Sequence, residues 1–375
     1  MEKSNSLHSR TEYDFLIITP LCFKNQLIKL VKHKKKFNIE TLLVTLENIY
    51  KSKYFHIQGR DRQEKIKYFI KNAYEKWKIK YVLLIGGHKQ LPVRYIHNFD
   101  TYPGSSGIKE PPYISDLYYA DLYDQDGNFS SWDTNDNGIF GEWIGKVADD
   151  QDIDLNPDVC IGRLPCKNRT EVKVVIDKII NYEKNTSHKP WFKNIVAVGG
   201  NTYPELGNTP EGEKDLSEAL TYMKNFNHIE LYSSNKKLTR GNIIRAINRG
   251  CGFLALSGHG NPPFWTTYVS TSTGFTWLPK FYTYHMHLLT NVNKFPICIA
   301  SGCRNSAFDT NPINLIKHPT LSYYWMDCIR DCWMWAIVKK PTGGAIASLG
   351  STGIGHIKYE HVTGGKADGW SYLLT

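Results

Sequence analysis

The sequence predicts an α/β protein with two α/β units, each made of a parallel sheet with flanking helices. First, short apolar runs of strand length alternate with helical stretches along most of the chain, which is typical of parallel strands joined by crossover helices. Second, several of these runs end directly at glycine or proline, where a strand gives way to a loop. Third, 375 residues exceed the usual size of one domain, which favours two units.

The first unit is expected to contain the strand-like runs at residues 13–19, 40–46, 81–85 and 158–163. Helical stretches at residues 23–36, 63–77 and 170–184 alternate with them, and Thr170 is the expected N-cap of the last one. Residues 100–158 are rich in Gly, Pro, Asp and aromatic residues and show no helical period. No long helix is therefore expected between 100 and 158.

A linker is predicted at residues 185–191, which read NTSHKPW. The two units are accordingly placed at residues 1–187 and 188–375. After the linker, strand-like runs follow at residues 194–198, 252–256, 295–300 and 344–349, with a helix near 216–225. Residues 371–375 fall partway through a helix-like stretch, so we expect the C-terminus to be incomplete.

The composition narrows the class of protein. With 41% hydrophobic and 22% charged residues, the chain has enough apolar material for a core, which excludes wholesale disorder. The formal net charge of +10 is a mild excess over 375 residues, and the basic run at residues 33–36 has no interleaved aromatic residues, so no nucleic-acid partner is expected. No apolar run reaches the roughly 18 residues that a membrane helix needs, so no membrane span is expected.

The N-terminal residues and the cysteine spacing indicate the cellular compartment to expect. Residues 1–13 are polar and lack the apolar region of a secretory signal, and the eight cysteines fall at no C-x-x-C spacing. Both observations favour reduced thiols and a cytoplasmic location.

Two strand ends in the second unit carry side chains with catalytic potential. The run CGFLALSGHGNP places His259 directly after an apolar strand, and PICIASGCRNSAF places Cys303 after another. Because reactive groups of open parallel sheets gather at the carboxyl ends of the strands, the two side chains can face each other. A thiol beside an imidazole is an activated nucleophile. The alternative is a core histidine and a small buried cysteine, each with a purely structural role.

The glycines around this histidine fit the same chemistry. Gly258 and Gly260 flank His259, and we expect them to let a substrate backbone approach closely. The N–H groups of Gly260 and Cys303 could together form an oxyanion hole. His88 follows Gly86 and Gly87 in a similar context, but no cysteine block accompanies it, so we interpret it as a loop residue.

Several blocks together resemble the gingipain-type cysteine peptidases, a family of the caspase-like clan. They are SGHGNPPFW, IASGCRNSAF and GGAIASLGSTGIG in the second unit, and DFLIITP, LLVTLENIY, ISDLYYADLY and IGRLP in the first. The resemblance covers almost the whole chain from Tyr13. It implies a caspase-like second unit and a cysteine endopeptidase that acts on proteins or peptides, with Cys303 as nucleophile and His259 as general acid/base. Relatives are commonly secreted.

The resemblance also implies two acidic groups. One is a third catalytic residue that orients the imidazole, for which Glu205, Glu211 and Glu213 are candidates and Glu205 is preferred. The other is an acidic pocket that accepts Arg or Lys on the substrate, and Glu211 could supply this charge.

A candidate calcium loop lies in the first unit. Asp133, Asn135 and Asn137 alternate before Gly138, and Glu142 follows, which is a pattern of hard oxygen ligands that suits Ca²⁺. The twelfth position of this frame is Ile144 rather than a bidentate acid, so the loop is not an EF-hand. The family's use of structural calcium favours a metal site, and a solvated loop of Asx-turns is the alternative.

The leading hypothesis for function is therefore a cysteine endopeptidase. The main rival is a non-catalytic binding or scaffold protein that keeps the caspase-like fold. A basic nucleic-acid binder ranks last, because it rests on the net charge alone.

Overall fold

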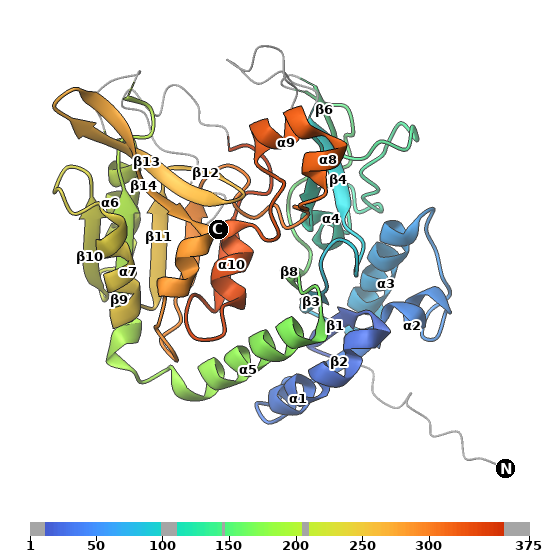
Figure 1. Ribbon diagram of the computed structural model, residues 1–375. Coiled ribbons are helices and arrows are strands. Elements are labelled where there is room, and N and C mark those ends of the chain that lie inside the picture. The colour runs from blue at the N-terminus through green and yellow to red at the C-terminus, as the bar shows by residue number, and fades with distance from the viewer. Residues whose placement is uncertain (1–11, 99–110, 145–146, 205–209, 356–375) are drawn as a thin grey trace. The chain divides into compact units, whose positions relative to one another are not determined.

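The structure is a computed structural model that describes residues 12–98, 111–144, 147–204 and 210–355. It divides into two compact units, Met1–Ile176 and Asp177–Thr375 (Figure 1). The division falls inside the helix α5 (Arg169–Asn185), whereas the sequence places it in the linker that follows. Each unit contains a parallel sheet with flanking helices, as predicted.

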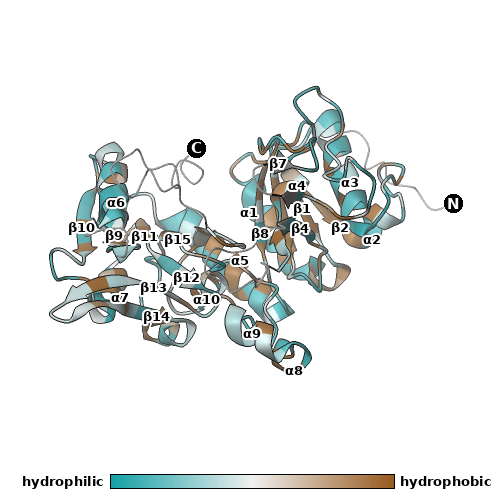
Figure 2. Ribbon diagram, turned by 90° about the horizontal axis from the view of Figure 1, so that it is seen from above, coloured by the Kyte–Doolittle hydropathy of each residue, from teal (hydrophilic) through white to brown (hydrophobic). Residues whose placement is uncertain are grey.

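The first unit is built on the sheet β2-β1-β3-β8, in which all neighbours are parallel. Its strands are β1 (Phe15–Thr19), β2 (Thr41–Thr45), β3 (Tyr81–Ile85) and β8 (Cys160–Leu164). Leu16, Ile18, Val44 and Leu84 are fully buried at its centre. In Figure 2 the ribbon of this sheet is largely in the hydrophobic colour, whereas the ribbon of the neighbouring helix α3 (Arg62–Trp77) carries both hydrophilic and hydrophobic residues.

Three helices of this unit follow the predicted stretches: α1 (Lys24–Lys35), α3 and the first part of α5. The sequence does not predict the two short helices α2 (Leu46–Tyr50) and α4 (Leu117–Ala120). The side chain of Asp61 caps α3 by accepting from the Glu64 amide at 2.7 Å. The predicted N-cap of α5 is wrong, because Asn168 rather than Thr170 accepts from the amide three residues on, at 2.9 Å.

The first unit also contains a second, smaller sheet in the order β5-β4-β6-β7. Its strands are β4 (Arg94–Asn98), β5 (Tyr113–Ser115), β6 (Glu142–Ile144) and β7 (Val147–Ala148). These strands are short, which agrees with the absence of a long periodic pattern in this part of the sequence.

The second unit is built on the parallel sheet β10-β9-β11-β15-β16. Its strands are β9 (Asn194–Gly199), β10 (Asn227–Tyr232), β11 (Phe253–Ser257), β15 (Ile297–Ser301) and β16 (Ala347–Gly350). The helices are the rest of α5, α6 (Glu211–Tyr222), α7 (Arg240–Arg249), α8 (Asn314–Lys317), α9 (Pro319–Trp325) and α10 (Trp333–Lys339). Figure 1 shows β11 in the middle of this sheet.

A three-stranded antiparallel sheet rises from the end of β11. It consists of β12 (His259–Asn261), β13 (Phe264–Thr271) and β14 (Gly274–Tyr282). The sequence does not predict this sheet, because residues 259–282 show no clear alternation of apolar and polar side chains.

Lys178 on α5 holds the loop between α10 and β16 in the second unit. Its buried Nζ lies within hydrogen-bond distance, 2.7–3.1 Å, of the carbonyl oxygens of Val338, Lys340, Gly343 and Ala345. In the part of the chain that the structure describes, no helix is long and apolar enough to cross a membrane.

Candidate active site

The strands that precede His259 and Cys303 are neighbours in the central sheet. β11 and β15 pair in parallel with Ser257 opposite Ser301, so both chains leave the sheet at the same edge. Just beyond that edge the two loops touch: a Cβ on Gly302 would lie 3.2 Å from the Gly260 nitrogen and 3.2 Å from the His259 carbonyl carbon. The structure thus brings the histidine and cysteine blocks into direct backbone contact.

Asn305 clamps the cysteine turn to the histidine hairpin. Its Nδ2 donates to the carbonyl oxygens of Asn261 and Phe264, both at 2.8 Å, and the residue is fully buried. Trp265 on β13 adds a bond in the opposite direction, from its Nε1 to the Ser301 oxygen at 3.1 Å. These three hydrogen bonds fix the hairpin against the end of β15.

A backbone carbonyl orients the His259 ring. The Nε2 atom lies 2.6 Å from the Thr202 oxygen, in the loop that follows β9. A carbonyl oxygen only accepts hydrogen bonds, so this contact requires the proton of the ring on Nε2. The other ring nitrogen, Nδ1, is thereby left as the basic atom of the neutral imidazole.

Aromatic rings enclose the same imidazole. Tyr203, Tyr268 and Trp277 have ring centroids 5.4, 5.9 and 4.9 Å from that of His259. Tyr268 and Trp277 come from adjacent strands of the hairpin sheet and lie 4.0 Å apart. Trp277 is 37% exposed, so this aromatic wall reaches the surface beside the histidine.

Glu211 supports the carbonyl that holds His259. It begins α6, and one carboxylate oxygen accepts hydrogen bonds from the Thr202 amide and, at 3.1 Å, from the Tyr203 amide. The side chain is buried, and its other oxygen has no hydrogen-bond partner among the described residues. Burial raises the pKa of Glu211, and the bonds from the Thr202 and Tyr203 amides oppose this shift.

The other two acids proposed from the sequence have different surroundings. Glu213 accepts hydrogen bonds from the amide and hydroxyl of Ser234, so it holds the loop after β10. Glu205 lies outside the described residues.

The glycines beside the histidine have a packing role that the sequence did not indicate. A Cβ on Gly258 would lie 2.5 Å from the Thr266 oxygen, and one on Gly260 would lie 2.2 Å from the Asn305 side chain. The protein itself, rather than an approaching substrate, fills the space where these side chains would be. The Gly260 nitrogen lies next to Gly302, the residue directly before Cys303.

Cys303 differs from the cysteines of the sheet core. Its side chain is partly exposed, whereas Cys251 and Cys298 are buried, and burial raises the pKa of the Cys251 thiol to about 12. Cys22 and Cys160 are exposed in the first unit.

The predicted calcium loop is closed by its own hydrogen bonds. Glu142 accepts from the side-chain amides of Asn135 and Asn137, at 3.2 and 2.6 Å, and Asp133 pairs with Arg60 at 2.7 Å. The four predicted ligands are therefore gathered in one loop, and one of them, Asp133, is already paired with the Arg60 guanidinium. Within the described ranges, no group of three or more His, Cys, Asp or Glu side chains could hold a metal ion. Calcium stays a prediction here.

Comparisons with known proteins agree with this geometry. The model of the family described as Peptidase family C25 matches residues 8–368. The chain therefore belongs to Peptidase family C25. Among curated proteins it is 26% identical over 294 residues to gingipain R2 of Porphyromonas gingivalis, covering 76% of this chain and 31% of that protein. It is also 26% identical over 181 residues to Lys-gingipain HG66 of the same organism, covering 46% of this chain and 10% of that one.

The fold is shared with a solved structure. The crystal structure of the Arg-specific cysteine proteinase gingipain R aligns with 93% of this chain and 64% of that chain, at a TM-score of 0.58 and 22% identity. This likeness confirms the predicted α/β fold with a caspase-like second unit. The chain spans about a third or less of the length of the gingipain R1 and R2 relatives it matches.

The sequence missed the residues that support the site. Thr202 acts through its backbone, which no side-chain pattern reveals. Asn305 lies two residues after Cys303 in the same motif, so its position was the one available signal. Trp277 and Tyr268 belong to the hairpin sheet that was not predicted.

The contact at Gly302 can be tested by adding one methyl group. We expect Gly302→Ala to lower any peptidase turnover by about tenfold or more, because the new Cβ would lie 2.4 Å from Asn305 Oδ1 and 3.2 Å from the His259–Gly260 peptide bond, so the cysteine turn would have to shift. Gly241→Ala is the matched control, since nothing lies within 4 Å of a Cβ there. Turnover and thermal unfolding of both variants give the result. Equal turnover in both would contradict the close contact.

Proposed function

We propose that the chain is a cysteine endopeptidase that cleaves proteins or peptides, with Cys303 as nucleophile and His259 as general acid/base. One observation carries the proposal: Gly302 packs against the peptide bond between His259 and Gly260, so two strand ends far apart in the sequence share one small region. Membership of Peptidase family C25 supports the same reaction.

The proposed reaction begins at the thiol. His259 Nδ1 takes the proton of Cys303, and the thiolate attacks the carbonyl carbon of the scissile bond, forming a carbon–sulfur bond. The carbonyl oxygen becomes an oxyanion, and the amides of Gly260 and Cys303 are proposed to hold it. The oxyanion then collapses, the carbon–nitrogen bond breaks, and the imidazolium gives its proton to the leaving amine.

Water completes the cycle. His259 Nδ1 removes a proton from a water molecule, whose oxygen attacks the thioester carbon. The carbon–sulfur bond breaks, and the imidazolium returns its proton to the sulfur, so the thiol and the neutral imidazole are restored. Throughout, the bond from Nε2 to the Thr202 carbonyl keeps the ring in one orientation and stabilises its charged form.

A preference for Arg or Lys in the substrate is also proposed. The surroundings of Glu211 favour a role for this residue in positioning His259 through Thr202, because one carboxylate oxygen is engaged by two amides and the side chain is buried. The partly exposed ring of Trp277 beside His259 offers a different means of contact with a cationic side chain, through its aromatic face.

Removal of either catalytic group tests the proposal. We expect Cys303→Ala and His259→Ala each to lower peptide cleavage by about three orders of magnitude, since the groups act as a unit. Cys22→Ala, at an exposed cysteine of the first unit, is the control and should cleave normally. Cleavage of a peptide library by purified protein is the measurement.

A thiol-reactive peptide electrophile separates the enzyme from the non-catalytic scaffold. Selective modification of Cys303, with slower reaction at the exposed Cys22 and Cys160, supports the enzyme. Equal rates at all three sites, together with unchanged cleavage in both catalytic variants, would reject the assignment.

Two substitutions distinguish the possible roles of Glu211. Glu211→Gln keeps an oxygen that can accept from the two amides, so we expect kcat and the preference for Arg or Lys to be nearly unchanged. Glu211→Ala removes the acceptor and should lower kcat by about tenfold or more. If Glu211 instead bound a substrate cation, Glu211→Gln would raise KM for Arg and Lys substrates as strongly as Glu211→Ala.

The pH dependence of unfolding gives Glu211 a second readout. Its pKa is raised above the ordinary 4.5, so the folded protein holds this proton more tightly than the unfolded chain. The stability due to this group therefore falls as pH rises from 4.5 through the folded-state pKa, and Glu211→Gln removes that fall. The variant should gain stability relative to the wild type across this window.

Calcium binding by the loop at Asp133 is proposed from the sequence pattern and from the gathering of its oxygen-bearing side chains. We expect Ca²⁺ to raise the unfolding temperature of chelator-treated protein by a few degrees and Mg²⁺ to do so less. Glu142→Gln should weaken the effect, and Asp126→Asn, at an exposed neighbouring position, should not. No shift with Ca²⁺ would leave the loop as a set of Asx-turns.

A further inference from the structure

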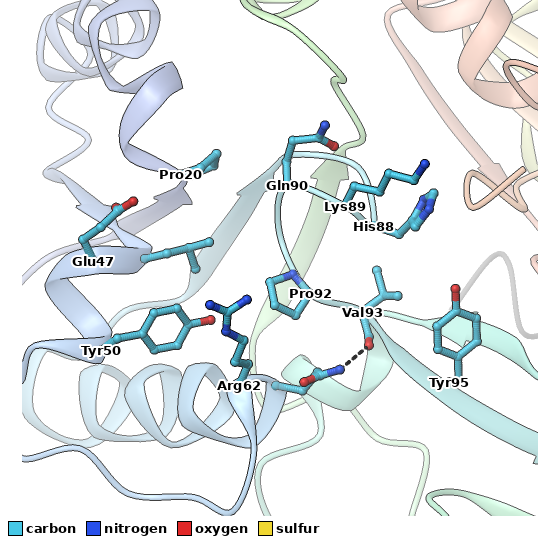
Figure 3. Close-up of a pocket in the computed structure, with 12 residues that line it drawn as sticks. Pro20, Glu47, Tyr50, Arg62, His88, Lys89, Gln90, Pro92, Val93 and Tyr95 are labelled. Carbon is cyan, nitrogen blue, oxygen red and sulfur yellow. Dashed lines mark hydrogen bonds between the residues drawn. The ribbon is translucent and has the colours of Figure 1, made fainter. Parts of the chain in front are cut away.

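The first unit has a cavity that the proposed peptidase chemistry does not use. It has a volume of about 520 Å³ and is lined by residues that follow three strands of the parallel sheet (Figure 3). Pro20 follows β1, Leu46 follows β2, and His88 follows β3. The cavity therefore lies at the carboxyl edge of this sheet, and its volume is in the range of about 300–1,000 Å³ typical of small-molecule sites.

The strand order places this cavity where α/β sheets bind ligands. β1 lies between β2 and β3, so the chain leaves β1 on one side for β2 and then crosses to the other side for β3. At such a reversal the loops above neighbouring strands diverge and leave a crevice outside the carboxyl ends. The cavity occupies this crevice.

Two polar groups of its wall are buried without a partner. The Oε2 atom of Glu47 and the hydroxyl of Tyr50 are shielded from solvent, and neither has a hydrogen-bond partner among the described residues. Such groups cost free energy unless something binds them. Burial raises the pKa of Tyr50 to about 12, so its hydroxyl is a neutral donor at physiological pH. A ligand hydroxyl group could donate to the Glu47 carboxylate and could accept from the Tyr50 hydroxyl.

The cavity also carries a surplus of positive charge. Arg62 and Lys89 line it and are exposed, against the single carboxylate of Glu47. The Arg62 guanidinium lies 5.7 Å from the centre of the Tyr50 ring, and the two side chains adjoin in Figure 3. Arginine presents its donors in a fork that fits phosphate oxygens.

The wall behind these groups is rigid. Gln63 donates from Nε2 to the Val93 carbonyl at 3.1 Å, which ties the first turn of α3 to the segment after β3. Gln90 is tied to the Lys167 carbonyl at 3.4 Å. A preformed cavity binds with a smaller cost in ordering than a loop that closes on its ligand.

We propose that the first unit binds a small phosphorylated compound with free hydroxyl groups, of the sugar-phosphate or nucleotide class. Arg62 and Lys89 hold the phosphate, while Glu47 and Tyr50 bind the hydroxyls. The site is separate from the proposed peptidase centre, and its existence does not depend on that proposal.

Calorimetry on the intact chain tests the site with three probes: glucose 6-phosphate, adenosine monophosphate and inorganic phosphate. We expect at least one of the two organic phosphates to bind more tightly than inorganic phosphate, because only they reach Glu47 and Tyr50. Arg62→Gln should weaken all binding by about tenfold or more. Lys65→Gln removes the same charge from the same helix outside the cavity and should leave affinity within about twofold.

Tyr50→Phe gives the second arm. It should weaken the organic phosphates and leave inorganic phosphate unchanged, since it removes one hydroxyl contact and no charge. The proposal is overturned if no probe binds at millimolar concentration, or if Arg62→Gln and Lys65→Gln bind alike. Peptide cleavage by Arg62→Gln, measured alongside, should equal that of the wild type, so failure of this site is distinguishable from failure of the peptidase.

Discussion

The close packing of Gly302 against the peptide bond between His259 and Gly260 is the constraint on which the candidate active site depends. Parallel pairing of β11 and β15 brings the two chains to one sheet edge, but pairing alone leaves their loops free to diverge. The absence of side chains at Gly302 and Gly260 lets the backbones meet, and the buried amide of Asn305 fills the remaining space. The cysteine and histidine blocks, far apart in the sequence, are thus held together by backbone packing and by the buried side chain of Asn305.

A second layer of support orients the imidazole. The Thr202 carbonyl fixes Nε2, and Glu211 in turn fixes the Thr202 amide from the first turn of α6. The chain of contacts runs from a helix through a loop backbone to the ring, so the fold itself orients the Nε2 nitrogen. The aromatic rings of Tyr203, Tyr268 and Trp277 restrict the ring further and shape the surface beside it.

The regular parts of this fold follow from local sequence. Residues 81–85 were predicted as a strand and form β3, and the predicted helix at 63–77 is α3 within one residue, because apolar period and a capping aspartate act locally. The positions of His259 and Cys303 at strand ends were also predictable. Thr202, Asn305 and the hairpin sheet were not, since they depend on which segments meet in space.

The most direct test of the account is a crystal structure of the protein after reaction with a peptide electrophile. We predict a covalent bond to the Cys303 sulfur, with the peptide oxygen within hydrogen-bond distance of the Gly260 and Cys303 amides and His259 Nδ1 facing the sulfur. Attachment at another cysteine, or an adduct on Cys303 whose oxygen points away from both amides, would contradict it.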